Sequence, residues 1–394
     1  MLESIKVLAF THYLQGPLAA QLLGDLGADV IKVESVSGAF ERNWSGMDAY
    51  INGESVNFFI GNRSQRSLSI NLKTTEGKQI IYELAKNADV VIENFRPSVM
   101  ERLGFDYELL KKFNPGLVYC ECSAYGSGGP YKDLPGQDLQ AQAISGYMMQ
   151  GGRSYDPPMP VGTAIVDEHA AVLASMGILA ALYSKKKTGV GRKVECSLLD
   201  AALDLQMEPI DIYLNGFPLY PRSASGISTR TGQAPYGVFK TSDGYLCLSM
   251  ISLDLLAKIF SDETFLTWVL DGQFVRREEI NELVAKWMLT NTTEYWMKRL
   301  DEFGAWYSVI NDYDAVTKDP QVIWNEYFNE MDHPIAGKIK LMSHPVRYNG
   351  KTYKGTRAPA LIGQHTEEIL RELGYSDEQI RILEEKKVIR TNKK

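Results

Sequence analysis

The chain has 394 residues, of which 44% are hydrophobic and 23% are charged, and its net charge at pH 7 is −7. An acidic chain of ordinary globular composition is a poor general binder of nucleic acid, so no nucleic-acid partner is expected. At about 100–200 residues per domain, the length predicts two domains. The four cysteines are scattered without the spacing of a metal site and predict reduced core thiols and no bound metal.

Neither the N-terminus nor the apolar segments predict a membrane partner. The first ten residues, MLESIKVLAF, lack the basic segment and long apolar run of a signal peptide. The most apolar helix, expected at Ala170 to Tyr183, is shorter than the ~20 residues needed to cross a bilayer. We therefore expect a cytoplasmic protein.

Strand-like and helix-like segments alternate over roughly the first 120 residues. Strands are expected at 5–10, 30–34, 66–72, 89–93 and 117–121, with helices at 18–26, 74–87 and 98–103. This alternation is typical of an α/β fold with a doubly wound, mostly parallel, Rossmann-like sheet. Ligands of such sheets bind beyond the carboxyl ends of the strands. The expected ligand-binding loops are therefore 11–17, 34–66, 94–98 and 123–138. A dinucleotide site is not indicated, because Gly16 is the only glycine of the first loop.

A glycine-rich loop from Ser123 to Pro130 follows the fifth strand. It is not a Walker A loop, because no Lys-Ser or Lys-Thr pair follows it. Gly126, Gly128 and Gly129 permit either a close backbone approach to a ligand or a plain turn. A helix is expected next, from 137 to 150.

Asp167 precedes the most apolar helix of the chain. Residues 170–182 are apolar almost all round and predict a buried helix, which ends in a basic turn and Gly189. An Asp in this place is either an N-cap, worth about 1 kcal/mol, or a nucleophile whose charge the helix-end N–H groups stabilise. This stretch alone leaves both interpretations open and favours the cap.

The composition changes after the strand expected at 193–197 and the helix expected at 198–213. Residues 215–235 are rich in Gly, Pro and Ser, and a hairpin is expected at 236–249, followed by three helices to about residue 302. We therefore assign residues 1–205 together with 325–394 to a large α/β domain. Residues 225–324 are assigned to a small α+β domain and 206–224 to a linker.

Five basic residues lie near the ends of the third and fourth strands: Arg63, Arg66, Lys73, Arg96 and Arg102. In an otherwise acidic protein, such a group would suit a ligand that carries phosphates.

Ordered matches to one family run through nearly the whole chain. They include Gly16-Pro17, LGDLGADVIKVE at 23–34, ADVVIENFRP at 88–97, PMPVGTAIVD at 158–167 and GQHT at 363–366. On these residues the chain resembles the class III CoA-transferases, which include formyl-CoA:oxalate and carnitine CoA-transferases.

The resemblance implies that Asp167 is the nucleophile of a CoA-transferase and that Gln15 lies in the loop lining the thioester. The implied CoA-binding residues are Ile70, Lys73, Asn94, Arg96 and Arg102. Possible substrate-loop positions are Gly126, Gly128, Gly129, Gln137, Asp138 and Gly232. The resemblance also implies acyl-CoA and a carboxylic acid as substrates, no tightly bound cofactor, and an interlaced homodimer.

Two alternatives remain open at this point. The α-methylacyl-CoA racemases share the fold and the Asp, but they carry Gly-His-Asp where this chain has Gly136-Gln137-Asp138. Two-base racemisation needs a second proton carrier, which Gln137 cannot be, so the racemase is disfavoured. A non-catalytic CoA-binding protein would leave Asp167 idle. The residue after Glu34 is Ser35, where relatives often have a CoA-binding Arg. The sequence does not indicate which acyl-CoA donor or which acceptor acid the enzyme uses.

Overall fold

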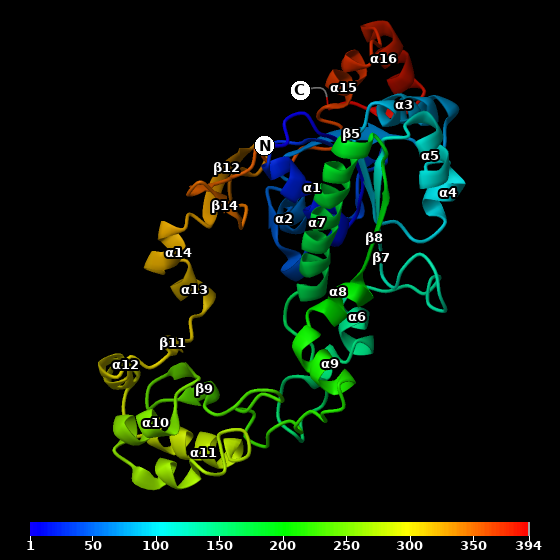
Figure 1. Ribbon diagram of the computed structural model, residues 1–394. Helices are drawn as coiled ribbons and strands as arrows, with labels where there is room; N and C mark the ends of the chain where they lie inside the picture. Colours follow the sequence, from blue (N-terminus) through cyan, green and yellow to red (C-terminus); the bar gives the residue numbers. More distant parts are fainter. Residues whose placement is uncertain (393–394) are drawn as a thin grey trace. The chain divides into compact units, whose positions relative to one another are not determined.

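The computed structural model describes residues 1–392, and the chain folds into two compact units (Figure 1). The first unit comprises Met1–Ala141, Thr163–Leu205 and the chain from Pro320 on. The second comprises Gln142–Gly162 and Gln206–Asp319. These boundaries differ from the expected ones, because 142–162 and the expected linker at 206–224 belong to the second unit.

The first unit is built on a seven-stranded sheet with the strand order β16-β5-β2-β1-β6-β7-β8. Neighbouring strands are parallel except β16, which pairs antiparallel with β5. The strands are β1 (Lys6–Phe10), β2 (Asp29–Glu34), β5 (Gln65–Ile70), β6 (Val90–Glu93), β7 (Val118–Ser123), β8 (Lys193–Ser197) and β16 (Ile389–Arg390). The expected α/β class with a mostly parallel sheet is confirmed. The edge strand β16 was not expected, because two residues carry no strand pattern.

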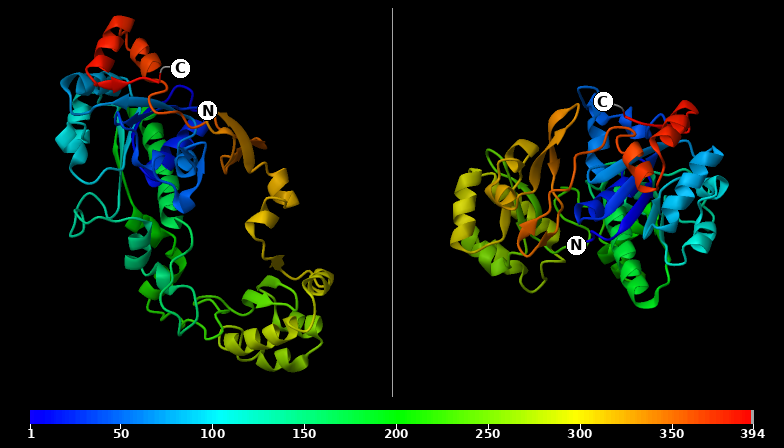
Figure 2. Two further views of the ribbon diagram at one scale, coloured as in Figure 1. Left: turned by 180° about the vertical axis from the view of Figure 1, so that it is seen from behind. Right: turned by 90° about the horizontal axis from the view of Figure 1, so that it is seen from above.

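Helices cover both faces of this sheet. In β1, Val7 and Ala9 are buried on one face while Leu8 and Phe10 are buried on the other, as parallel strands require. Helices α1 (Gln15–Asp25) and α7 (Ile165–Thr188) pack against each other on the first face (Figure 1). The second face is covered by α3 (Thr75–Lys86), α5 (Tyr107–Phe113), α15 (Thr366–Glu372) and α16 (Asp377–Glu385). Figure 2 shows the C-terminal pair α15 and α16, in red, near α3, in light blue.

The strand order reverses at β1, which is the switch point where doubly wound sheets bind ligands. The loop after β1 and the loop after β6 flank this point. They are tied together by Asn94, whose side-chain amide donates to the carbonyl O of His12 and accepts from the His12 N–H, both at 2.8 Å.

Helix α7 differs from its prediction in two ways. It begins at Ile165, and its N-cap is Ala164, so the interpretation of Asp167 as the N-cap is wrong. The helix is buried on one face only, where it packs on α1. On the other face Val172, Met176 and Tyr183 are 49%, 61% and 64% exposed. The prediction of a helix buried all round is therefore wrong, because apolar side chains do not by themselves show what covers them.

The length of α7 also differs. It has 24 residues, and by length and composition it could cross a membrane, so the expectation that the most apolar helix is too short is wrong. Core helices of soluble proteins pass the same test. In this chain Ala170, Ala174 and Ile178 lie fully buried in the core shared with α1 and the sheet.

Shorter elements complete the first unit. They are β3 (Tyr50–Ile51), β4 (Glu54–Ser55), α2 (Val56–Gly61), α4 (Val99–Leu103), α8 (Leu198–Asp204), α14 (Pro320–Trp324), β12 (Phe328–His333), β13 (Gly337–Met342), β14 (Arg347–Tyr348) and β15 (Lys351–Thr352). Helix α6 (Asp138–Ile144) begins in the first unit and ends in the second. The hairpin of β12 and β13 was not predicted.

The second unit has its own core. An antiparallel sheet of order β11-β10-β9 packs with helices around Phe239, Leu246 and Trp296. Its elements are α9 (Met207–Leu214), β9 (Tyr236–Lys240), β10 (Tyr245–Ser249), α10 (Leu253–Phe260), α11 (Arg277–Met288), α12 (Thr293–Glu302), β11 (Tyr307–Val309) and α13 (Tyr313–Val316). The predicted hairpin at 236–249 is confirmed as β9 and β10.

Candidate active site

Asp167 lies in the first turn of α7, and another carboxylate caps that helix. The backbone N–H groups of Val166 and Asp167 donate to Oδ2 of Asp138 at 2.7 and 3.0 Å. Asp138 is the first residue of α6 and is buried. The N–H groups at the start of a helix need such an acceptor, and Asp138 supplies it. The carboxylate of Asp167 is therefore not used as the cap of its own helix. The sequence had marked Asp138 only as a substrate-loop position.

The surroundings of Asp167 make its carboxyl group unusually basic. Burial raises the pKa of Asp167 to about 7, and the negative charges of Asp138 and Glu168 act in the same direction. A hydrogen bond from the Gln15 backbone acts against this rise. A carboxylate with a raised pKa is a stronger nucleophile once it is ionised, and such shifts are typical of functional sites.

Gln15 is the first residue of α1, and it is brought to Asp167 by the packing of α1 on α7. Its side chain is buried, and its Nε2 donates to the carbonyl O of Cys196 at 3.4 Å. The next residue must be glycine, because a Cβ at Gly16 would lie 2.9 Å from Cγ of Asn94. The first turns of two helices thus meet at one carboxylate, where their N–H dipoles favour negative charge.

The glycine-rich loop lies next to the segment that carries Asp138. A Cβ at Gly136 would be 2.8 Å from Cβ of Ala124 and from the Tyr125 ring, so only glycine permits this contact. The loop glycines themselves have open space around the Cβ position, and Gly126 and Gly129 have φ angles of 100° and 82°. These two positions have the backbone conformation of a turn.

The hydrogen bonds of two other predicted substrate positions are local. Gln137 is exposed, and its backbone N–H donates to Oε1 of Gln140 at 3.1 Å. Gly232 belongs to the second unit, where its N–H donates to Oγ1 of Thr229 at 2.8 Å.

The pairing of His169 was not predicted. This residue lies one half-turn after Asp167, and its Nε2 is 2.7 Å from Oδ2 of Asp204 in α8. The sequence showed only a histidine in the first turn of a helix, because the pairing depends on the packing of α7 on α8.

The predicted CoA-binding residues follow the carboxyl ends of β5 and β6. Lys73, Arg96 and Arg102 are exposed, and Nη1 of Arg102 donates to Oγ of Ser98 at 2.7 Å. Ile70 is fully buried and pairs with Ile389 of β16, so its side chain presents no surface to a ligand in this structure. The amide of Asn94 is occupied by the backbone of His12, as described above.

Arg63 and Arg66 do not belong to a phosphate-binding group, and that part of the prediction is wrong. Arg63 is buried and donates to both carboxylate oxygens of Asp25, at 3.0 and 2.5 Å. Arg66 is buried and donates to Asp29 at 2.9 and 2.6 Å and also to two glutamates of α15. A buried guanidinium needs such carboxylates to offset its desolvation, so these two cations are already used inside the fold.

The cysteines are reduced. Cys120, Cys122 and Cys196 are buried, and Sγ of Cys120 lies 3.9 Å from Sγ of Cys122. Among residues 1–392, no three or more His, Cys, Asp or Glu side chains are grouped so as to hold a metal ion.

The whole chain has clear relatives. Residues 2–366 match the family described as CoA-transferase family III. The chain is 33% identical over 391 residues to human succinyl-CoA:glutarate CoA-transferase, covering 96% of this chain and 87% of the human protein. It is 30% identical over 409 residues to succinyl-CoA–D-citramalate CoA-transferase of Chloroflexus aurantiacus, covering 98% of both chains.

A solved structure supports the same relationship. The crystal structure of a CAIB/BAIF family protein from Brucella suis superposes with a TM-score of 0.80 at 28% sequence identity, covering 94% of this chain and 99% of that one. The family match spans nearly every element that builds the Asp167 site, from β1 to the start of α15. The chain therefore belongs to CoA-transferase family III, and it is a CoA-transferase.

Proposed function

We propose that this enzyme moves CoA from an acyl-CoA donor to a free carboxylic acid through covalent intermediates on Asp167. The observation that carries this proposal is the state of that carboxyl group. It lies half-buried in the first turn of α7 with its pKa raised to about 7, while Asp138 caps the helix. A basic carboxylate at two helix N-termini suits a nucleophile.

Four steps complete the transfer. The Asp167 carboxylate attacks the donor thioester carbonyl, which expels CoA thiolate and leaves an aspartyl–acyl anhydride. The thiolate then attacks the aspartyl carbonyl, which releases the donor acid and forms an aspartyl-CoA thioester. The acceptor carboxylate attacks this thioester, giving a second anhydride and free thiolate. Attack of the thiolate on the acceptor carbonyl yields the new acyl-CoA and restores Asp167.

Water must be kept away from each of these intermediates, because anhydrides and thioesters hydrolyse. The partial burial of Asp167 supports this requirement. We assign the loop of Gly126, Gly128 and Gly129 to covering the reacting groups, and Gln15 to the thioester. Lys73, Arg96 and Arg102 are assigned to the phosphates of CoA, because they are exposed cations beyond the carboxyl ends of two strands near the switch point.

We further propose succinyl-CoA as the donor and a short dicarboxylic acid as the acceptor. The support is that both relatives described above are named for succinyl-CoA and for glutarate or D-citramalate. Mass spectrometry of CoA exchange tests this choice, with succinyl-, acetyl- and formyl-CoA each offered to glutarate, oxalate and a monocarboxylic acid. Faster exchange from formyl-CoA to oxalate than from succinyl-CoA to glutarate would overturn it.

Trapping with hydroxylamine tests the covalent route directly. Donor acyl-CoA, enzyme and hydroxylamine are expected to leave a hydroxamate on the peptide that contains Asp167, because hydroxylamine cleaves both the anhydride and the thioester. The peptide is identified by mass spectrometry. Continued turnover without any modification of that peptide would contradict the mechanism.

The pH dependence of the reaction follows from the raised pKa of Asp167. Since only the carboxylate is nucleophilic, kcat/KM for the acyl-CoA is expected to fall about tenfold per pH unit below about pH 7. In Asp138→Asn the amide oxygen still accepts from the helix N–H groups, but the negative charge is lost. The acidic limb is therefore expected to move to lower pH. Rates measured between pH 5 and 9 check both statements, and a limb that moves to higher pH in the variant would refute the assigned charge effect.

We propose a homodimer in which a second copy covers the exposed face of α7. The support is the apolar stripe of Val172, Met176, Leu179 and Tyr183. A Met176→Glu substitution is expected to raise the dimer dissociation constant by at least about 100-fold, because about 1.5 kcal/mol of apolar burial is lost in each copy. Light scattering after size-exclusion chromatography, over a range of protein concentrations, measures the mass of the particle and so the fraction that is dimeric. Leu270→Glu, a change at a fully exposed leucine of the second unit, is the control and should leave the dimer intact.

A further inference from the structure

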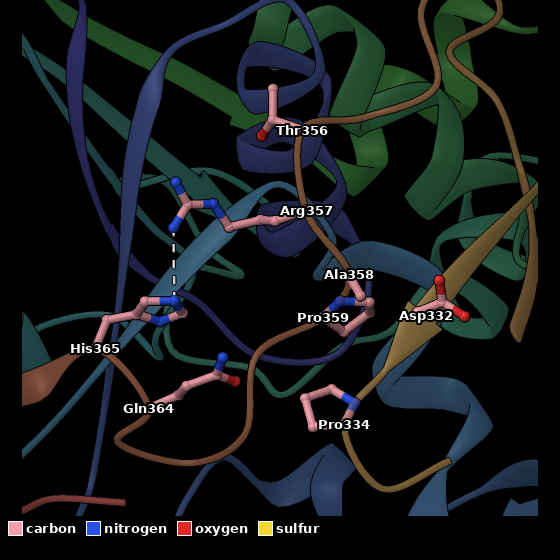
Figure 3. A pocket seen from close by; sticks show the side chains of 8 residues that line it. All are labelled: Asp332, Pro334, Thr356, Arg357, Ala358, Pro359, Gln364 and His365. Carbon is pink, nitrogen blue, oxygen red and sulfur yellow. Dashed lines mark hydrogen bonds between the residues drawn. The ribbon is translucent and has the colours of Figure 1, made fainter. Parts of the chain in front are cut away.

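A cavity of about 250 Å³ lies in the first unit and shares no residue with the Asp167 site (Figure 3). It lies between the end of β12 and the chain from Thr356 to His365, which leads into α15. Its polar lining includes Asp332, Arg357, Gln364 and His365. None of these residues has a part in the transfer mechanism.

The ring of His365 points a donor into this cavity. Its Nδ1 accepts from the backbone N–H of Ser67 at 3.2 Å, so the ring proton of the neutral form is on Nε2. Burial and the neighbouring Arg357 lower the pKa of His365 to about 4, so the ring is neutral at pH 7. Nε2 lies 3.5 Å from Nη1 of Arg357 (Figure 3). The N–H groups of His365 and Arg357 are therefore both donors, and a ligand bound between them must supply a hydrogen-bond acceptor.

Gln364 adds a third donor. Its side-chain Oε1 accepts from the backbone N–H of Leu361 at 2.8 Å, which orients the amide. The NH₂ group is the part of that amide left to serve the cavity, which Gln364 lines together with His365 (Figure 3). Unlike Arg63 and Arg66, Arg357 makes no ion pair with a carboxylate among the salt bridges of residues 1–392.

The cavity is held in place by β5 and the residue before it. The backbone N–H of Ser64 donates to the carbonyl O of Arg357 at 2.9 Å, and its Oγ accepts from the N–H of Thr356 at 3.0 Å. On the other side, the N–H of His365 donates to the carbonyl O of Ser67 at 3.1 Å. These bonds fix the backbone that carries Arg357 and His365, which reduces the conformational entropy lost on binding.

We propose that this cavity binds a small hydroxy- or amino-carboxylic acid at a site separate from the transfer reaction. The ligand's carboxylate accepts from Arg357, Gln364 and His365, which suit a planar, charged acceptor. Pro334 and Pro359 form apolar walls for a short carbon chain, and Asp332 accepts from the hydroxyl or ammonium group. The negative charge of Asp332 disfavours a dianion such as inorganic phosphate.

Proton NMR of the histidine rings tests the site in the intact enzyme. The chain has five histidines, so the spectrum contains few Hε1 signals and each can be followed separately. The His365 signal is identified by its loss in His365→Gln. L- or D-lactate is expected to shift this signal saturably, and propionate to do so about tenfold more weakly, since it lacks the hydroxyl for Asp332. Lactamide and phosphate should shift it at least about tenfold more weakly than lactate. A response to phosphate equal to that to lactate would overturn the ligand class.

Variants separate this site from the transferase site. Arg357→Gln is expected to weaken lactate binding by at least about tenfold. Gln364→Glu should do the same, because its carboxylate still accepts from Leu361 but repels the ligand. Asp167→Ala should bind lactate like the unaltered enzyme, so the result does not depend on the proposed mechanism. The four other histidine signals report whether each variant is folded. A shift that persists in folded Arg357→Gln and Gln364→Glu, or its absence in the unaltered enzyme, would refute the site.

Discussion

Replacing Asp167 with Ala is expected to lower kcat for CoA transfer by at least about 10⁴-fold, because no other group can form the anhydride and the aspartyl thioester. Asp167→Asn should lose as much, since an amide keeps the shape of the side chain but not its nucleophilic oxygen. The measurement is steady-state transfer from the acyl-CoA that the unaltered enzyme uses best. Its companion readout is the hydroxamate, which should disappear in both variants.

Glu168→Gln is the matched control for this experiment. Glu168 is the neighbouring carboxylate in the same helix turn, is exposed, and accepts from Thr163 Oγ1 at 3.5 Å. Its replacement is expected to change kcat by less than about tenfold, because the proposed chemistry uses no bond to it. Transfer by Asp167→Ala at a rate near that of Glu168→Gln would exclude Asp167 as the nucleophile.

Glu93→Gln is expected to stabilise the enzyme against unfolding at high pH. Glu93 lies at the end of β6 with 5% exposure, and burial raises its pKa to about 8, with the nearby Glu121 acting in the same direction. A carboxyl group whose pKa is raised by folding favours the native state below about pH 4.5, and that contribution is lost as the pH rises to about 8. At about 1.4 kcal/mol per pH unit, the loss is roughly 4–5 kcal/mol.

The difference in unfolding free energy between Glu93→Gln and the unaltered enzyme is therefore expected to grow between pH 5 and pH 8 and then level off. The amide oxygen can still accept from the Phe95 N–H, as Glu93 does at 2.9 Å. Urea unfolding at pH 5, 7 and 9 measures this. Glu121→Gln, by contrast, should destabilise the fold by breaking the 2.9 Å ion pair with Lys193. A difference that is constant across this pH range would show that Glu93 ionises normally.

Local sequence patterns were enough to predict the class of the fold and most of its elements. The apolar runs at 5–10, 30–34 and 193–197 lie within one residue of β1, β2 and β8. These features depend on neighbours within a few residues, and such patterns are written directly in the chain. Two-residue strands such as β16 depend on a partner strand instead, and for this reason no pattern revealed them.

Some features of the candidate site could likewise be predicted from the sequence, and others could not. Asp167 could be singled out from the sequence, because an Asp before an apolar helix and the ordered family motifs both mark it. The identity of the helix cap could not, because Asp138 lies 29 residues earlier and reaches α7 only after folding. The raised pKa of Asp167 likewise comes from burial and from charges assembled by the fold.

The limit of prediction from the sequence is clearest for the charged and the apolar residues. From the sequence, Arg63 and Arg66 looked equivalent to Lys73, yet the fold buries both arginines against carboxylates and leaves the lysine exposed. The apolar residues of α7 looked equally buried, yet only one face meets the core. The sequence alone determined which residues are charged, apolar or nucleophilic and where helices and strands form. The tertiary structure decided which of them are paired, buried or open to a ligand, because those properties depend on contacts between distant segments.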